Sequence, residues 1–206
     1  MTTGSSDAAA FFRDVVTRHR RCFWLDGGGA REWSGNRSII GWLEPDEVSL
    51  TYDAARRQVT RHTGDRAVVV GDDVFDVLAG ELAADPEGQW FGYLGYACRP
   101  DLPARAGGPL PDAVWLRPRS VRLFHHETAP SRAGSPSRRS TAGVPEWYRA
   151  AFERVQEELH AGNTYEANLT YRVSVRSDLS PPEAYLRLRA LNPAPYAGFL
   201  QHDVPG

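Results

Sequence analysis

Residues 191–202 read LNPAPYAGFLQH and close the most clearly patterned part of the chain. The run Tyr196–Gln201 predicts a strand. Immediately before it, Pro181 or Pro182 suits the first turn of a helix, because proline lacks only a backbone N–H that would be unpaired there. The apolar residues of that helix are Tyr185, Leu188 and Leu191. The stretch therefore predicts a helix that leads directly into a strand.

Upstream of this pair, residues 165–176 alternate between apolar and polar side chains without a break, a pattern typical of a strand. Before them, Pro145 can begin a helix and Gly162 can end it. Its apolar stripe consists of Tyr148, Phe152, Val155 and Leu159. The segment from Glu146 to His202 is therefore predicted to run helix, strand, helix, strand.

The first part of the chain predicts a mixture of helices and antiparallel strands. A helix is expected over about residues 7–20, since Phe11, Phe12, Val15, Val16 and His19 share one helical face. A second helix, capped by Asp72 or Asp73, would use Val74, Val77, Leu78 and Leu82 as its apolar face. The predicted strands are 22–25, 38–43, a hairpin over 47–62, and 67–71. These elements predict an α+β fold.

An aromatic run, WFGYLGY at residues 90–96, predicts a central strand. Its two glycines, Gly92 and Gly95, would allow another backbone to approach closely. Packing of these aromatic side chains in a core is favoured over a ligand-binding role. Extended structure is expected to resume over residues 112–126.

Residues 127–143 contain no large apolar side chain and predict a flexible linker. Its arginines, Arg132, Arg138 and Arg139, are expected to be solvated rather than to bind nucleic acid. We therefore divide the chain into a region 1–126, a linker 127–144 and a region 145–206.

Composition limits the class of protein. The formal net charge is −2, which disfavours nucleic acid or an anionic membrane surface as a partner. Cys22 and Cys98 are far apart in the sequence and fit a reduced, cytoplasmic compartment. No apolar run approaches the roughly 20 residues of a membrane span. We expect a soluble cytoplasmic protein.

Common catalytic motifs are missing from the sequence. It has no Gly-rich phosphate loop, no HExxH and no GxSxG. All of its basic side chains except histidine are arginine, which excludes a lysine nucleophile. His125 and His126 would point to opposite faces of a strand and chelate no common metal. Gly27–Gly29 favours a turn over an anion cradle, and the roles of Glu166 and Asn168 stay open between ligand contact, solvent and a covering helix.

Four motifs in order carry a family resemblance: FWLDGG (23–28), WFGYLGY (90–96), YEANLT (165–170) and LNPAPYAGFL (191–200). Together they resemble the large-subunit family of chorismate-using enzymes, which includes aminodeoxychorismate synthase component I and anthranilate synthase component I. The first two motifs are more similar to the aminodeoxychorismate synthase branch. The resemblance implies an α/β sandwich of two orthogonal antiparallel sheets, fed by both halves of the chain, with the C-terminal half of the fold missing here.

The resemblance also implies an amino-acid pocket that binds tryptophan or a similar ligand. The family's pocket positions fall on Leu25, Asp26, Gly27, Pro195, Tyr196 and Ala197. Relatives often have serine where this chain has Gly27, and that hydroxyl helps to hold the ligand's amino group.

For activity, the resemblance implies transaminase-type amination of chorismate to 4-amino-4-deoxychorismate, the precursor of 4-aminobenzoate for folate or related antibiotics. It implies Mg²⁺ in the complete enzyme and a glutamine amidotransferase as partner, with a separately encoded C-terminal half as another candidate partner. The family's magnesium carboxylates and nucleophilic lysine follow the segment that matches LNPAPYAGFL. We therefore expect no catalytic residue and no bound metal in this chain, and no turnover by it alone. The alternatives are an anthranilate synthase component I fragment, a stand-alone amino-acid-binding module, or a truncated product without function.

Overall fold

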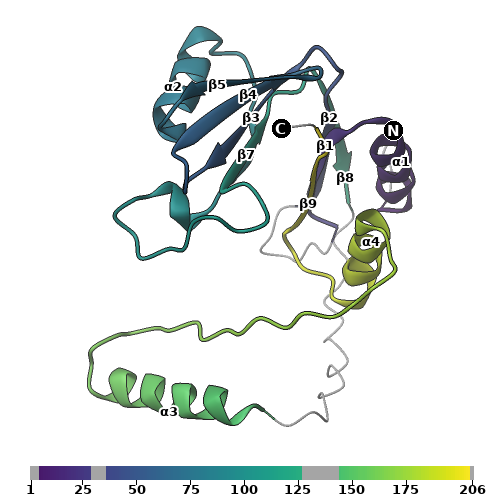
Figure 1. Ribbon diagram of the computed structural model, residues 1–206. Coiled ribbons are helices and arrows are strands. Elements are labelled where there is room, and N and C mark those ends of the chain that lie inside the picture. The colour runs from purple at the N-terminus through teal and green to yellow at the C-terminus, as the bar shows by residue number, and fades with distance from the viewer. Residues whose placement is uncertain (1–4, 29–35, 127–143, 205–206) are drawn as a thin grey trace. The chain divides into compact units, whose positions relative to one another are not determined.

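The computed structural model of the chain describes residues 5–28, 36–126 and 144–204 (Figure 1). The chain forms two compact units, one of residues 1–130 with 180–206 and one of residues 131–179. In the described ranges, no helix has the length and apolar character needed to cross a membrane.

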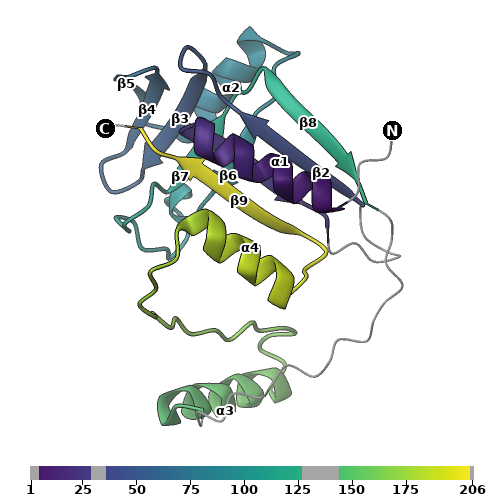
Figure 2. The same ribbon diagram turned by 90° about the vertical axis from the view of Figure 1, so that its right-hand side faces the viewer.

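The first sheet of the larger unit has the strand order β8-β2-β1-β9, with every pair antiparallel. Its strands are β1 (Arg21–Asp26), β2 (Arg37–Trp42), β8 (Ser120–His125) and β9 (Ala197–His202). Two helices, α1 (Ser5–Arg18) and α4 (Pro181–Leu191), lie on the same face of this sheet (Figure 2). The predicted helices at 7–20 and from Pro181 are confirmed, as are the strands predicted at 22–25, 38–43 and 196–201.

The strand that ends at His202, β9, lies at one edge of the first sheet. It pairs with β1 over six residues, from Arg21↔His202 to Asp26↔Ala197. The last strand is thus built into the sheet that the first strand begins.

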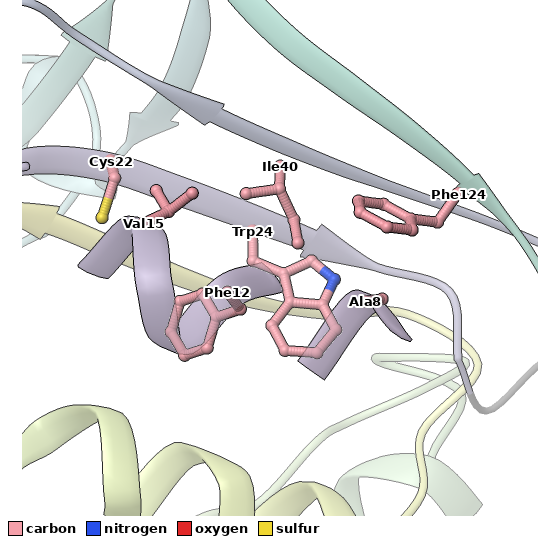
Figure 3. Close-up of a cluster of buried hydrophobic side chains, with 7 residues drawn as sticks. All are labelled: Ala8, Phe12, Val15, Cys22, Trp24, Ile40 and Phe124. Carbon is pink, nitrogen blue, oxygen red and sulfur yellow. The ribbon is translucent and has the colours of Figure 1, made fainter. Parts of the chain in front are cut away.

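A hydrophobic core lies between α1 and the first sheet (Figure 3). It contains Ala8, Phe12, Val15, Cys22, Trp24, Ile40 and Phe124, all buried. Phe12 contacts Trp24, with ring centroids 4.9 Å apart, and Phe199 of β9, at 5.0 Å. Cys22 and Trp24 reach this face together because alternate residues of a strand share a face.

The second sheet has the order β5-β4-β3-β7-β6, also antiparallel. Its strands are β3 (Val48–Asp53), β4 (Gln58–Thr63), β5 (Arg66–Gly71), β6 (Phe91–Leu94) and β7 (Ala113–Leu116). The helix α2 (Val74–Ala84) packs on its outer face, and Asp73 caps the helix by accepting from the N–H groups of Phe75 and Asp76. These findings confirm the predicted hairpin, the strand at 67–71 and the capped helix.

The inner faces of the two sheets pack against each other, so the larger unit is layered helix, sheet, sheet, helix (Figure 1). Phe23 of β1 stacks on Phe91 of β6, with ring centroids 4.4 Å apart. Buried Arg21 links the same layers, because its guanidinium donates to the carbonyls of Glu44 and Glu47 at 2.9 and 2.8 Å and to Ser49 Oγ at 3.0 Å. Two antiparallel sheets with helices confirm the predicted fold class.

The aromatic run at 90–96 does not form a central strand. Only Phe91–Leu94 is a strand, β6, and it lies at the edge of the second sheet with β7 as its partner among the described strands. Tyr96–Cys98 turns into a short 3₁₀ helix, η1, which ends the strand. The close backbone approach predicted at the two glycines is confirmed, since a Cβ on Gly92 would lie 1.9 Å from the Val114 carbonyl oxygen.

The smaller unit contains one helix, α3 (Glu146–His160), among its described residues. It confirms the predicted helix, and Gly162 follows it with a φ of 75°. The strand predicted at 165–176 is wrong: these residues have no strand partner in the described chain, and Tyr165 and Val175 are 99% and 82% exposed. Alternation places side chains on two faces, but a strand also needs a neighbour for its backbone hydrogen bonds.

The linker predicted at 127–144 falls almost entirely outside the described residues, as do its three arginines. The predicted division into regions 1–126 and 145–206 stays a prediction. The structure groups α4 and β9 with the first 130 residues in one compact unit.

Candidate functional site

Pairing of β1 with β9 brings the two halves of the predicted pocket together. Leu25 is the register partner of Gly198, and Asp26 is the partner of Ala197. The segment 25–27 therefore lies beside the segment 195–197, although neither sequence motif specifies the other. Because neighbouring residues of a strand project to opposite faces, Leu25 and Asp26 belong to two different environments.

On the Leu25 side, a cavity of about 230 Å³ lies between β1, β9 and β6. Its lining residues are apolar, aromatic or glycine: Phe23, Leu25, Phe91, Gly92, Tyr93, Gly198, Phe199 and Leu200. The Tyr93 hydroxyl donates to the Pro111 carbonyl at 2.7 Å, so it is already engaged. This environment suits an apolar or aromatic group and supplies no charge to orient one.

On the other side, the Asp26 carboxylate is buried in a polar network. Oδ1 accepts from Gly28 N–H at 2.8 Å and from Ser38 Oγ at 3.0 Å, and Oδ2 accepts from the Tyr185 hydroxyl at 3.0 Å. Arg189 of α4 forms an ion pair with the same carboxylate. Burial acts to raise the pKa of Asp26, but its hydrogen bonds to Arg189 and to the other donors outweigh burial and leave the pKa below its ordinary value. Asp26 is therefore a fixed anion.

Ser38 and His126 extend this network. Ser38 Oγ lies 2.6 Å from His126 Nε2 and 3.1 Å from the Gly27 N–H that donates to it. Both side chains are buried, and His126 Nδ1 has no hydrogen-bond partner among the residues that the structure describes. Burial lowers the pKa of His126, which favours the neutral ring. A serine with no exposed surface cannot meet a substrate, so the serine and histidine here serve the structure.

The predicted opposition of His125 and His126 is confirmed, since His125 is exposed and His126 is buried. Over the described ranges, no group of three or more His, Cys, Asp or Glu side chains could hold a metal ion. Glu166 and Asn168, whose roles were open, are both exposed in the smaller unit.

Gly27 is required by the backbone. A Cβ at this position would lie 2.2 Å from the Arg37 carbonyl oxygen, so a serine could not replace it without a shift of β2. The neighbouring Gly28 leaves room for Arg189, whose Nη2 would lie 1.9 Å from a Cβ there. Of the other predicted pocket residues, Tyr196 is 67% exposed, and Pro195 and Ala197 are partly buried.

The sequence indicated Asp26 but not its partners Ser38, Tyr185 and Arg189, nor His126, which contacts Ser38. A weak signal existed for two of them, because Tyr185 and Arg189 are four residues apart and share a face of a predicted helix. Nothing in the sequence indicated which strand that face would meet.

A larger polar hollow, of about 570 Å³, lies away from this site. Its arginines are already paired within the chain: Arg117 with Asp85, and Arg119 with Asp46 and Glu47. Because both arginines are engaged by carboxylates of the chain, we assign this hollow no ligand.

Comparison with known proteins supports the family resemblance. Residues 126–205 match the family model of chorismate binding enzymes. The chain is 26% identical over 254 aligned residues to an aminodeoxychorismate synthase of Streptomyces pristinaespiralis, covering 95% of this chain and 35% of that protein. It is 43% identical over 53 residues to the aminodeoxychorismate synthase of Streptomyces griseus, covering 26% of this chain and 7% of that protein.

Anthranilate synthases are also similar. Component 1 from Archaeoglobus fulgidus is 39% identical over 62 residues, which are 30% of this chain and 15% of that protein. The matches span 35% or less of the length of these three relatives.

Proposed function

We propose that this chain, a relative of the chorismate-using enzymes, is the N-terminal portion of an aminodeoxychorismate synthase component I. In this proposal the complete enzyme aminates chorismate to 4-amino-4-deoxychorismate, for 4-aminobenzoate and folate or for a related antibiotic. One observation carries it: the alignment to the Streptomyces pristinaespiralis synthase covers 95% of the chain, while residues 126–205 match the chorismate-binding family.

The described residues supply scaffold and pocket to this function. β1 and β9 hold the two pocket segments in register, and α4 fixes the end of β1 through Arg189. The apolar cavity beside Leu25 is where the side chain of a regulatory amino acid would lie, because its lining suits an aromatic or aliphatic group.

Magnesium, which the resemblance implies for the complete enzyme, has no fitting site among these described residues. The best-placed buried carboxylate, Asp26, is engaged with Arg189 and three other donors. We therefore derive no magnesium-dependent step from them, and we propose that this chain alone does not turn over chorismate.

Two other functions are supported by specific observations. The match to the Archaeoglobus fulgidus protein favours an anthranilate synthase component I as the second candidate. The apolar cavity favours a stand-alone binding module as the third. For the first candidate we also propose a cytoplasmic location and a glutamine amidotransferase partner that supplies ammonia.

The test is an assay with chorismate, ammonium and Mg²⁺. The chain is assayed alone and mixed with a separately produced C-terminal part of the Streptomyces pristinaespiralis synthase, and that C-terminal part alone is the control. We expect 4-amino-4-deoxychorismate only from the mixture. Anthranilate in its place would favour the second candidate, and product from the chain alone would contradict the proposed inactivity. Silence in every sample of folded protein would count against the synthase assignment.

A further inference from the structure

The strand β5 is the end strand of the second sheet (Figure 1). Residues 66–70 are all exposed, and because successive residues of a strand point to opposite faces, β5 is uncovered on both faces. Three consecutive valines, Val68, Val69 and Val70, are 40%, 55% and 40% exposed. Among the described strands β5 pairs with β4 alone, so alternate backbone N–H and C=O groups on its other side have no strand partner. Such an edge can accept another strand.

The other edge strands of the two sheets are better protected. β6 and β9 each expose one residue, Leu94 and Gly198. β8 exposes Val121 and Leu123, with the charged Arg122 between them. Charged residues and proline commonly protect the edge strands of natural proteins, and residues 67–71 contain neither. Among the described strands, β5 is therefore the edge that is most open to a further strand.

The two ends of β5 carry opposite charges. Arg66 begins the strand, and Asp72 follows its last residue. Arg66 has no ion pair or hydrogen bond within the described chain. Asp72 pairs with Arg57 at 3.2 Å, but the two side chains are 75% and 67% exposed, which leaves the carboxylate open to a second cation. A parallel strand of the same sequence would place like charges together, whereas an antiparallel one places Arg66 near Asp72.

We propose that β5 is a self-association edge, which pairs antiparallel with β5 of a second copy of this chain about a two-fold axis near Val69. Val68 then lies opposite Val70 of the second copy, and Arg66 lies opposite its Asp72. Each of these contacts occurs twice, because the two-fold axis relates the copies. The inference goes beyond the proposed function and does not depend on it.

The shape of β5 limits the strength of this contact. Its register with β4 shifts between Val59 and Thr60, and an irregularity of this kind bends a strand. The paired stretch is therefore short, and the dimer is weak and reversible.

Sedimentation velocity of the whole chain at a series of concentrations tests the proposal. The wild-type chain is compared with Val69→Lys, which places a charge at the centre of the edge. Val121→Lys is the matched control, since Val121 is 38% exposed on β8, an edge strand of the other sheet. Circular dichroism confirms that each variant is folded.

We expect a wild-type dimer with a Kd of about 100 µM, in keeping with a small interface. Val69→Lys should raise this Kd at least about tenfold, because the two ammonium groups would face each other across the axis. Val121→Lys should leave the Kd unchanged. A wild-type chain that stays monomeric up to about 500 µM would overturn the proposal, and so would a dimer that Val69→Lys leaves intact.

A charge exchange tests the direction of pairing and does not require Val69→Lys to fold. Arg66→Glu should raise the Kd at least about threefold, because the new carboxylate faces Asp72 of the second copy. Addition of Asp72→Arg should restore the wild-type Kd. A folded double variant that binds no more tightly than Arg66→Glu would overturn the antiparallel arrangement.

Discussion

The imidazole rings of His62 and His202 meet edge to face, with centroids 5.0 Å apart, although they belong to different sheets. His62 lies on β4, and its Nε2 is hydrogen-bonded to Thr51 Oγ1 at 2.8 Å. His202 lies on β9, and its Nε2 is hydrogen-bonded to Ser49 Oγ at 2.9 Å. Burial lowers the pKa of both rings, that of His202 to about 4, and the guanidinium of Arg21 lowers them further. Two neutral histidines thus join the sheets.

This pair predicts acid sensitivity. Because the unfolded chain binds protons on these rings near pH 6.5 and the folded chain does not, the free energy of unfolding should fall as the pH drops from about 6.5 toward 4. His202 contributes up to about 3 kcal/mol to this loss. Urea unfolding at a series of pH values measures it. His202→Gln should flatten the dependence, whereas His125→Gln, at an exposed position of β8, should leave it unchanged. Equal slopes for His202→Gln and wild type would contradict the assignment.

Gly92→Ala should destabilise the larger unit by about 1–3 kcal/mol, since the added Cβ would overlap the Val114 carbonyl of the paired strand β7. Gly80→Ala is the control. No atom lies within 4 Å of a Cβ at that position of α2, and alanine favours a helix by about 1 kcal/mol over glycine. Thermal unfolding should therefore shift in opposite directions for the two variants, and a neutral Gly92→Ala would show that β6 is free to move away.

Arg21→Met should cost at least about 3 kcal/mol, because it removes the donor to the buried Glu47 carbonyl and Ser49 Oγ and to the part-buried carbonyls of Glu44 and Pro45. The neighbouring Arg20 offers a matched control. Its ion pairs with Asp65 and Asp203 are exposed and long, at 3.7 and 3.8 Å, so Arg20→Met should cost less than about 1 kcal/mol. Denaturant midpoints of the two variants give the comparison. Similar losses from both would mean that the Arg21 contacts add little.

Phe12→Ala should destabilise the chain by about 3–5 kcal/mol, since Phe12 is fully buried between Trp24 and Phe199. Phe75→Ala removes a ring of equal size that is 39% exposed on α2, and should cost about 1 kcal/mol or less. Near-ultraviolet circular dichroism during unfolding reports the Trp24 environment directly. A small effect of Phe12→Ala would indicate that α1 does not depend on this core.

Local sequence patterns correctly predicted features that depend mainly on the residues of the element itself. The spacing of Phe12 and Val15 predicted which face of α1 is buried, and the glycines of WFGYLGY predicted a close backbone approach. Capping by Asp73 was likewise predicted from its position before an apolar stripe. The helix face and the cap depend on residues within one or two turns of the helix, whereas the glycines only leave room for a backbone, and the fold supplies that of Val114.

Local sequence patterns gave wrong predictions where the structure depends on a strand partner that is distant in the sequence. The alternation in residues 165–176 does not form a strand, because no described backbone lies beside it to accept its hydrogen bonds. The run at 90–96 lies at a sheet edge, because strand order depends on which segments pair rather than on aromatic content.

The sequence by itself determined the helices, most of the strands, the α+β class and the family resemblance, because periodicity and short motifs encode these directly. Only the tertiary structure decided that Asp26 meets Arg189, 163 positions away, and that His62 meets His202. Such pairs follow from the register of β1 with β9 and from the stacking of two sheets. The motif that contains Asp26 does not indicate which cationic side chain will lie beside its carboxylate in the folded chain.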